Sequence, residues 1–599
     1  RCVIVSHMDA SVDVDGQSTS LATHQFPGVG PTNGYANLVS YAQDPLPRWV
    51  YDVRGSELEQ TLALARGHNV LVLRYVWRGA RPAQLTLRPL LAMRPFHCLV
   101  REHGAMIQRV EMRQHEVSVR PVPALPRLVF RHRGVFVGSP DWWRRFEYLV
   151  EQVRGHDFQE DLWSPGVFRI RLDAGAAAYV TCGLDGVPER TEEQLLEQAA
   201  DALRACDPGT DRALPVRRLW VATELFRADL AHTPSVVTGY PCSGVWGRCT
   251  LLAVPGLYLV QGRVEDAKRV VAALIGSMRR GLIPSRIPDD GSSNEFHGVD
   301  ASLLLFPVAR RMAACCGVDD PYVRDVLLPA MREVFETILR GTSSGIRVTD
   351  QGLLAADAQG TPLTWMGARV AGGSPTSRAG LPVEVQALWS KACDDLAWVT
   401  EQLGDLPLAR RAAEARDRAR AAFRERFWCQ GTQYPYDVVS ADNAPHERWE
   451  DSTVRPNAVV ALAVDSDLFT PSQAKAIVDR AQRDLLTPAG LRSLSPHDPD
   501  YMGRQTGTSI ERNRASHQGT AWPFLLGAFC TAMRHAYPTQ VGRHTAVQAQ
   551  IEAMLSNASA LGQVPEVADG DPPHRPDGCV AHAVGVGELL RVFVEELGM

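Results

Sequence analysis

Hydrophobic and polar residues alternate in short runs over the first part of the chain, up to about Leu184. Alternation with a period of two is typical of strands that bury one face. Turn signals separate the runs; DVDG at 13–16 lacks the rest of a calcium loop and predicts a hairpin. Many short strands at this spacing predict an antiparallel β-sandwich over 1–187. The clearest runs are 69–77 (NVLVLRYVW), 168–172 (FRIRL) and 178–182 (AYVTC).

The pattern changes to a helical period from about Thr191, which is placed as the N-cap of an amphipathic stretch. We predict a helical linker over 188–235 and then helix after helix. Long helices in pairs, joined by loops rich in Trp, Asp, Gly and Pro, predict an α-toroid over 236–599 with a site at one end. The absence of a fixed repeat period disfavours a solenoid. Strong helical stretches are 264–281, 382–404, 407–428 and 519–536.

Composition narrows the class of protein. The chain has 599 residues with 45% hydrophobic and 22% charged residues, which is typical of a soluble globular protein. Its net charge of −5 provides no basic face for nucleic acid or anionic membranes. No run approaches the roughly 18 apolar residues of a membrane-spanning helix. We therefore expect a small-molecule or sugar-like partner, with no nucleic acid and no membrane, while a homo-oligomer stays open.

The cysteine pattern indicates the cellular compartment, and short motifs indicate whether a metal or cofactor is expected. The 12 cysteines are scattered without a CxxC pair, and no secretory leader is visible, so we expect buried thiols in a reducing, cytoplasmic compartment. No zinc ligand set, Walker-A motif or strand-linked GxGxxG is present, so we predict no metal and no cofactor. Lysine occurs only at Lys268, Lys391 and Lys475, which with abundant Ala, Pro and Gly suggests a GC-rich bacterial genome.

Six loops of the helical half combine aromatic residues with Asp, Glu, His, Arg and Gly. Rings stack on the apolar faces of sugars, and carboxylates and amides bind the hydroxyls, so such loops suit a sugar-like ligand. One such loop alone would be explained equally well by capping and tight turns; six in one half favour a site. They are 239–250, 281–302, 363–389, the residues around Arg455, those from His517, and 562–591.

These loops and their order resemble the amylo-α-1,6-glucosidases, the glycogen debranching enzymes, nearly end to end. In the β half the resemblance rests on 14–51 and 87–97. In the helical half it rests on GLIPSRIPDDG, PVEVQALW, VRPN, LLTPAGLRSLSPHDPDY, HQGTAWP and DGCVAHAV, in that order. The resemblance implies a β-sandwich followed by an (α/α)6 barrel.

The resemblance also implies an inverting hydrolysis of α-1,6-linked glucose, which needs one carboxyl group as acid and another as base. In this family the acid is expected directly after TWM, where the present chain has Gly367 in LTWMGARVAGG. The base is expected from the late glutamate, which is present as Glu566 in VPEVADGD. The chain therefore keeps the expected base and lacks the expected acid.

Other departures from the family pattern fall in the same loops. The chain has GYPCSGVWGRCT where the family reads like GYPWFGDWGRDT, so Cys242 and Ser243 replace aromatic residues, and Val245 and Cys249 replace aspartates. Near the C-terminal end the chain has AHAVG where the family reads like AQAWS, so His582 replaces a glutamine. The scaffold motifs persist while the residues expected to bind sugar and donate the proton differ.

The candidate site residues follow from these motifs, and several have simpler explanations. Cys249 also suits a small buried hydrophobic position; His517 is expected to start a helix and cap it; His582 is expected within an apolar helix as a core histidine. Glu384 and Trp389 are expected on one helix within two turns, so packing alone would also explain either residue. We predict catalytic roles for Glu566, His517, His582 and Cys249, and substrate binding by Trp246, Arg248, Asp300, Trp365, Glu384, Gln518 and Trp522.

Three functions fit the sequence. The favoured one is a retooled acid/base enzyme that carries out a cyclisation, elimination, hydrolysis or isomerisation on a non-glycogen small molecule in bacterial specialised metabolism, with Glu566 as the retained carboxylate and His297 as a further partner. The second is a non-catalytic sugar-binding protein. The third is an orthodox inverting α-1,6-glucosidase with a substitute acid, which general acid catalysis, worth roughly 10² to 10⁴ in rate, makes demanding.

Overall fold

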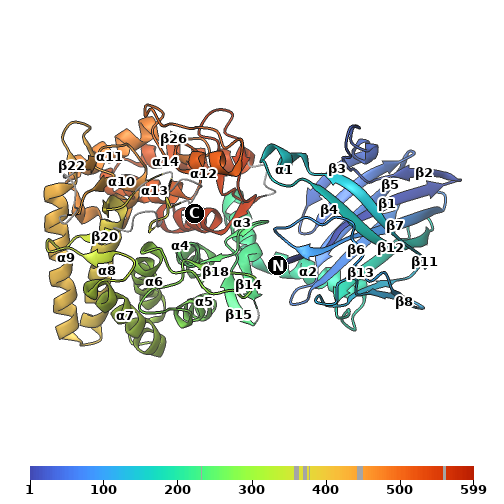
Figure 1. Cartoon of the computed structure of the whole chain (residues 1–599), viewed down its shortest axis with the longest axis horizontal. Coiled ribbons are helices and arrows are strands. Elements are labelled where there is room, and N and C mark those ends of the chain that lie inside the picture. Colours follow the sequence, from blue (N-terminus) through green and yellow to red (C-terminus); the bar gives the residue numbers. More distant parts are fainter. Residues whose placement is uncertain are drawn as a thin grey trace. The chain divides into compact units, whose positions relative to one another are not determined.

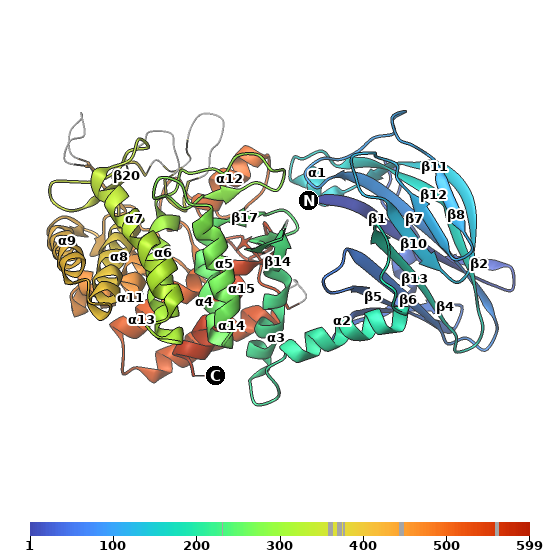
Figure 2. The same cartoon turned by 90° about the horizontal axis from the view of Figure 1, so that it is seen from below.

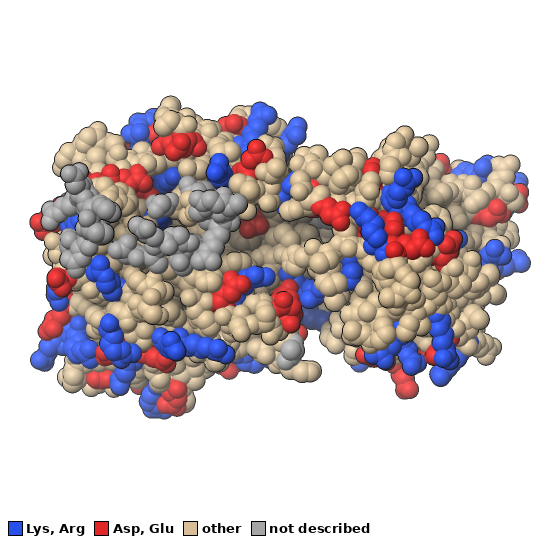
Figure 3. Space-filling view, in the orientation of Figure 1, with Lys and Arg blue, Asp and Glu red and all other residues tan. Residues whose placement is uncertain are grey.

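The computed structural model describes residues 1–230, 232–356, 363–367, 374, 376, 378–441, 449–557 and 562–598. The chain divides into two compact units, Arg1–Asp207 and Pro208–Met599 (Figure 1). Basic and acidic side chains are interspersed on the face drawn in Figure 3. Among the described residues, no helix is long and apolar enough to cross a membrane.

The first unit is the predicted antiparallel β-domain. Its strands form a five-stranded sheet in the order β11-β12-β7-β1-β2 and an eight-stranded sheet in the order β3-β4-β5-β6-β13-β10-β9-β8. The strands are β1 Cys2–Val14, β2 Gln17–Ser20, β3 Leu38–Gln43, β4 Pro47–Val53, β5 Ser56–Leu64, β6 Val70–Trp77, β7 Ala83–Pro95, β8 Val110–Arg113, β9 Glu116–Val119, β10 Leu128–His132, β11 Val135–Glu147, β12 Gln159–Leu172 and β13 Ala177–Leu184.

The alternating pattern explains how these strands pack. In β7, Leu85 and Leu87 are fully buried while Thr86 between them is less buried. The two leucines join Phe168 and Trp163 in the core of this unit. Burial of each such side chain stabilises the fold by about 1.5–3 kcal/mol. The predicted hairpin at 13–16 is confirmed, because β1 pairs with β2 across it.

The segment predicted as a helical linker is divided between the two units. Helix α2 (Glu192–Cys206) begins with a capping box between Thr191 and Gln194. Its buried leucines pack on residues of β5, β6 and β13, and Figure 2 shows it beside β5 and β6. Helix α3 (Leu214–Ala222) instead contributes to the core of the second unit. The boundary therefore falls between α2 and α3.

The second unit is the predicted (α/α)6 barrel. Within the described residues, an inner ring is closed by contacts that run α4, α6, α8, α10, α13, α15 and back to α4. Figure 1 shows helices of this ring around the centre of the unit and α5, α7, α9 and α11 around its edge. The inner helices are α4 Gly247–Leu257, α6 Asp300–Cys316, α8 Val383–Gln402, α10 Asn457–Val464, α13 Leu525–Ala536 and α15 Ala583–Arg591. The outer ones are α3, α5 Val264–Gly276, α7 Leu328–Arg340, α9 Leu406–Arg426, α11 Pro471–Asp484 and α14 Val541–Asn557.

The ring closes between its first and last helices because two glycines let them approach. A Cβ atom on Gly256 of α4 would lie 1.8 Å from the carbonyl oxygen of Gly587 on α15. Any side chain at Gly256 would push these helices apart. Since α15 follows the loop that carries Glu566, this close contact also fixes the last loop of the barrel beside the first.

Short strands connect the loops of the barrel, although the sequence predicts almost none there. Strand β16 (Gly239–Tyr240) in the first loop pairs with β31 (Ala581–His582) in the last. Such ladders of two or three residues are too short to show a period of two. Strand β28 (Ala521–Trp522) also corrects the prediction of a helix from 519, because α13 begins only at Leu525. The remaining pairs include β17 Val245–Trp246 with β18 Arg286–Ile287, β21 Leu381–Pro382 with β24 Val438–Val439, and β27 Gly490–Arg492 with β28.

Candidate active site

A cavity of about 1280 Å³ opens among the loops that precede the inner helices. The N-termini of the inner helices lie at this end, so each helix presents its first residues to the same space. Gly367 also lines the cavity, whereas 368–373 of the same loop lie outside the described residues. The predicted site residues in its wall are Trp246, Arg248, Cys249, Asp300, Trp365, Glu384, His517, Trp522, Glu566 and His582.

Gln518 is the predicted binding residue that does not line this cavity. Its side-chain oxygen accepts a hydrogen bond of 2.7 Å from Arg455, and its carbonyl accepts one of 2.6 Å from the Met502 N–H. Arg455 also donates to the His517 carbonyl at 2.6 Å. Gln518 therefore supports the loop that carries His517 from outside the cavity wall, where the prediction had placed it in contact with a ligand.

The two candidate histidines occupy helix ends that differ from the prediction. His517 is the last residue of α12 (Ser509–His517), not the start of a helix. His582 precedes α15 as its N-cap residue and belongs to β31, so it is not inside an apolar helix. Both side chains are buried, and neither Nδ1 atom has a hydrogen-bond partner among the described residues. Both positions direct the histidine into the loop region that surrounds the cavity.

Two of the carboxylates in the cavity wall are held by arginines. Asp300, at the start of α6, accepts a bond of 2.8 Å from Arg248, at the start of α4. Glu384 on α8 is held on both oxygens by Arg378, with its Oε2 at 2.7 Å. The side chains of Asp300 and Glu384 are 6% and 3% exposed, so each acid is both paired and shielded from water.

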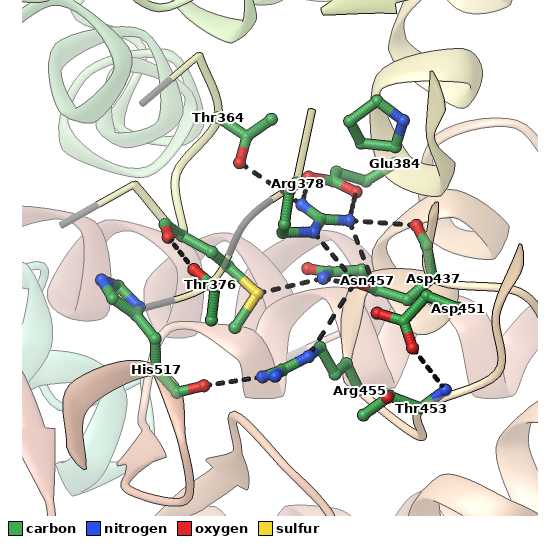
Figure 4. Close-up of polar contacts among 12 residues, drawn as sticks. Thr364, Thr376, Arg378, Glu384, Asp437, Asp451, Thr453, Arg455, Asn457 and His517 are labelled. Atoms are coloured by element: carbon green, nitrogen blue, oxygen red, sulfur yellow. Dashed lines mark hydrogen bonds and ion pairs between the residues drawn. The ribbon is translucent and has the colours of Figure 1, made fainter. Parts of the chain in front are cut away.

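Arg378 is the centre of a buried set of polar contacts, which we call the Arg378 network: Arg378, Glu384, Asp437 and Asn457 (Figure 4). The Arg378 Nε donates to Asp437 at 2.9 Å, and the Asn457 amide donates to the same carboxylate at 2.8 Å. Asn457 in turn accepts a bond of 2.8 Å from the indole N–H of Trp365. The network therefore fixes one tryptophan of the cavity wall.

Aromatic rings form one side of the cavity. Trp365 meets Trp522 edge to face at a centroid distance of 5.5 Å and Phe524 at 5.7 Å. His517 stacks on Trp522 at 6.0 Å with nearly parallel planes. The Trp522 N–H is satisfied by the Ser516 carbonyl at 2.8 Å. Edge-to-face packing and paired N–H groups make this wall rigid, so it offers a preformed apolar surface to a ligand.

Glu566 belongs to a polar group of residues instead of the aromatic wall. We call this group the Glu566 corner: Cys249, Glu566, Cys579 and His582. Its Oε2 accepts a bond of 3.0 Å from the Cys579 N–H, and its side chain keeps partial exposure. A Cβ atom on Gly578, whose φ is +69°, would lie 2.8 Å from Oε2, so a side chain there would displace the carboxylate. The Cys579 Sγ lies 3.0 Å from the Sγ of Cys242.

The titratable partners in this corner are neutral near pH 7. Burial raises the pKa of the Cys249 thiol to about 11, although the charge of Arg248 opposes the shift. Burial lowers the pKa of His582, and the Glu566 carboxylate only partly offsets this. Burial and nearby arginines lower the pKa of His517 to about 3. The corner thus combines one carboxylate with neutral imidazole and thiol groups, and it holds no thiolate nucleophile.

One further acid in the wall keeps access to the cavity. Glu295 lies 3.1 Å from His297 and 3.1 Å from Arg286, with its side chain 35% exposed. Asp289 and Asp290 belong to the turn that precedes this acid, where Asp290 accepts a bond from the Ser292 N–H. Glu295 with His297 is therefore a further acid/base pair that a ligand in the cavity can meet.

The roles of several of these residues could not be predicted from the sequence. Arg378 carries no motif of its own, and only the burial of Glu384 would have signalled a missing cation. The pairing of Cys242 with Cys579 spans 337 residues and has no local signal. The expectation of buried thiols is also wrong for Cys2, Cys98 and Cys315, which are exposed. Among the described residues, no group of three or more His, Cys, Asp or Glu side chains is placed to hold a metal ion.

Comparisons with known proteins agree with this architecture. Residues 221–591 match the family described as amylo-alpha-1,6-glucosidase, and residues 1–179 match the one described as glycogen debranching enzyme N terminal. A glycogen debranching enzyme of Saccharomyces cerevisiae is 25% identical over 396 residues, which covers 51% of this chain and 25% of the yeast enzyme. The chain thus spans about a quarter of that relative's length.

A solved structure shows the same fold at low identity. A bacterial glucoamylase complexed with acarbose superposes with a TM-score of 0.63 at 10% identity, covering 99% of this chain and 89% of the other. A stretch of 47 residues is also 45% identical to Germinal center kinase 3 of Caenorhabditis elegans, but it covers only 8% of each chain and bears on neither fold nor site. On the family match over 221–591, the chain belongs to the amylo-α-1,6-glucosidase family.

Proposed function

We propose that this protein is an acid/base enzyme that acts on a small molecule other than an α-glucan, with Glu566 as its reacting carboxylate. The observation that carries the proposal is the state of the acids in the cavity wall. Gly367 provides no carboxyl group where the family resemblance expects the acid, and Asp300 and Glu384 are held by arginines. Glu566 keeps partial exposure and accepts a hydrogen bond from the backbone N–H of Cys579, so it can change partners during a reaction.

The chemistry of this corner suits proton removal better than glycosidic hydrolysis. An alkoxide leaving group needs a strong general acid opposite the base. The groups near Glu566 are a buried imidazole with a lowered pKa and a thiol with a pKa of about 11, and neither is a strong acid at neutral pH. A cyclisation, elimination or isomerisation, or hydrolysis of a bond with a better leaving group, needs only the base and a weak donor. Such reactions are typical of specialised metabolism in bacteria.

The first test compares glucosidase activity directly. Purified protein is incubated with isomaltose, panose and limit dextrin, and glucose release is measured. We expect no release above that of a Glu566→Gln variant. Turnover by the unmodified protein that Glu566→Gln abolishes would overturn the proposal in favour of an orthodox debranching glucosidase.

The second test searches for the substrate. A small-molecule extract of the source organism is incubated with the protein, and mass spectrometry follows which metabolites are consumed. We expect at least one metabolite to be consumed by the protein and spared by Glu566→Gln. The matched control is Glu401→Gln, at an exposed position on α8, which should consume it at the normal rate. The same reaction in heavy water reports proton transfer to carbon as a gain in mass.

A non-catalytic sugar-binding protein is the other outcome that these tests separate. It also fits a cavity with aromatic walls in which Gly367 stands at the position expected for the acid. In that case isomaltose or limit dextrin would bind in calorimetry, and no metabolite would be consumed in a Glu566-dependent way. Binding of glucan without any consumption would therefore replace the enzyme by a binding protein.

A further inference from the structure

The cavity continues beyond the Glu566 corner along the axis of the inner ring. Helix α6 contributes Asp300, Leu304, Val308 and Arg311 to its wall. Residues three or four positions apart lie on one face of a helix, so this stripe faces the axis. Asp300 and Arg311 are separated by about three turns, or roughly 16 Å along the helix. The cavity therefore extends through much of the inner ring.

The chemistry of the wall changes along this path. The first turns of the inner helices carry the polar and aromatic residues already described. The next turns are apolar, and we call this layer the throat. Charged residues on α6, α8 and α15 follow below it, among them Arg311, Lys391 and Arg591. The throat consists of Leu252, Leu304, Pro307, Val308, Leu388, Val460, Ala463, Val464 and Ala528.

Parts of the throat are open rather than packed. Leu252, Pro307, Val460, Ala463 and Ala528 keep partial exposure and line the cavity, although their helices form the inner ring of the barrel. Protein interiors are normally filled to the density of organic crystals, because an unfilled apolar gap loses contacts. A hollow lined by apolar side chains beneath a set of polar groups is typical of a small-molecule site.

Small side chains keep the hollow open. Ala463 on α10 and Ala528 on α13 end at Cβ, where a leucine would extend toward the axis. Two prolines of the inner ring, Pro255 and Pro307, also face the cavity from inside α4 and α6. Proline removes a hydrogen bond of the helix and bends it. Pro307 belongs to the throat, and Pro255 follows Leu252 of the throat by three residues on α4.

The side chains of the throat have no hydrogen-bonding groups for a sugar. Buried hydroxyl groups that lose their water partners without new ones disfavour binding. An aliphatic group gains from the same surroundings, by about fourfold in affinity for each buried methylene. The throat therefore selects hydrocarbon over carbohydrate, which agrees with the loss of the family's sugar-binding residues around Gly367.

The charged layer below the throat forms its floor. Arg311 pairs with Glu595 at 2.6 Å, Arg591 pairs with Glu596 at 2.6 Å, and Lys391 pairs with Asp395 at 2.7 Å. These cations and carboxylates neutralise one another. A hydrocarbon chain gains nothing by entering this layer, so its end should stop at the throat.

We propose that the throat binds the aliphatic chain of an amphiphilic substrate whose polar, reacting end lies at the Glu566 corner. This inference names the substrate class of the proposed function and rests on it for the position of the reacting end. The binding of the chain itself depends only on the throat.

Alkyl glucosides with chains of increasing length test the unmodified protein. Methyl, hexyl and octyl glucoside are titrated by calorimetry below the concentrations at which they form micelles. We expect each protein molecule to bind one molecule of glucoside, with affinity rising roughly tenfold or more from hexyl to octyl glucoside. Equal affinities across the series would overturn the proposal.

Two variants place the bound chain in the throat. Ala463→Leu and Ala528→Leu fill the hollow from different helices, and each should weaken octyl glucoside at least tenfold. The matched control is Ala421→Leu, at an exposed position on α9, which should bind octyl glucoside as the unmodified protein does. Melting temperatures confirm that the variants fold. Unchanged binding in both throat variants would contradict the assignment, even if affinity still rises with chain length.

The Glu566→Gln variant separates this proposal from the proposed function. In this variant the rise in affinity from hexyl to octyl glucoside should persist, because the throat and not the carboxylate contacts the added methylenes. Glu566-dependent consumption of a metabolite, together with equal affinities across the alkyl series, would overturn the throat alone. A clear chain-length dependence without any Glu566-dependent consumption would overturn the enzymatic proposal alone.

Discussion

The Arg378 network reaches the cavity wall through Glu384, and the Glu566 corner reaches it through Cys249, Glu566 and His582, yet their acids are held in opposite ways. In the network, Glu384 and Asp437 share one guanidinium, with side chains only 3% and 2% exposed. In the corner, Glu566 is held by one backbone N–H and keeps partial exposure. A buried acid with all its partners in place stabilises shape, whereas a loosely held one can exchange a proton with a ligand. The cavity thus divides its carboxylates between structure and chemistry.

The surroundings of the two regions reinforce the difference. The network passes its rigidity to Trp365 through Asn457. The corner instead gathers buried groups that stay neutral near pH 7, including His582 and Cys249. Among the four residues of the corner, Glu566 is therefore the carboxylate that a substrate meets. The predictions below either break this division or make it sharper.

Removal of the network's cation should have the largest effect. In Arg378→Met, two buried carboxylates lose their common partner, which typically costs about 3–5 kcal/mol of stability. We expect a clear loss in thermal and denaturant unfolding of the helical unit. Glu566→Gln should cost less than about 1 kcal/mol, because one oxygen can still accept the Cys579 N–H.

The matched control for Arg378 is Arg286→Met. Arg286 also pairs with a cavity acid, Glu295, but its side chain is 42% exposed. Exposed pairs contribute about 0–1 kcal/mol, so this variant should unfold almost like the unmodified protein. If Arg378→Met and Arg286→Met proved equally stable, the network would not be the structural half of the cavity.

The second prediction concerns the pH dependence of stability. The pKa of His517 is about 3 in the folded chain because of burial, while an unfolded histidine titrates near 6.5. As pH falls below 6.5 the unfolded chain binds this proton first, so stability present at neutral pH is lost between pH 6.5 and 3. At pH 4.5 the loss from this one group amounts to about 2–3 kcal/mol.

Unfolding measured at pH 7 and pH 4.5 checks this value. The drop in stability between the two conditions should be smaller by that amount in His517→Phe, which keeps a ring to stack on Trp522. His68→Phe, at an exposed position in a turn, is the matched control and should lose stability with pH as the unmodified protein does. An unchanged drop in His517→Phe would mean that the imidazole is accessible to protons in the folded state.

The sequence predicts features that depend on nearby residues. The strand β6 and the N-cap Thr191 of α2 depend on neighbours within one element, and both predictions are confirmed. The network could not be predicted in this way, because Arg378 and Asp437 are 59 residues apart. The same holds for Cys242 and Cys579, which only the pairing of the first and last barrel loops brings together.

The sequence also does not show which face of a barrel helix points toward the axis. Helix α6 is buried on most of its surface, so its pattern does not distinguish the face toward the axis from the face toward the outer helices. The sequence alone therefore does not show which residues of α6 line the throat. Gln518 shows the same limit at one residue, since its position beside His517 suggested the ligand, whereas Arg455 holds its side chain.

The smallest effect is expected for Cys249, which the sequence nominates as a catalytic residue. With a pKa of about 11, only roughly one thiol in ten thousand is ionised at pH 7, so Cys249 cannot serve as the nucleophile. Cys249→Ser should consume the metabolite found in the extract within about threefold of the normal rate. Cys98→Ser, at an exposed position in the other unit, is the control. A loss of a hundredfold or more in Cys249→Ser alone would place a second reacting group beside Glu566 and end the description of the corner as one base among neutral neighbours.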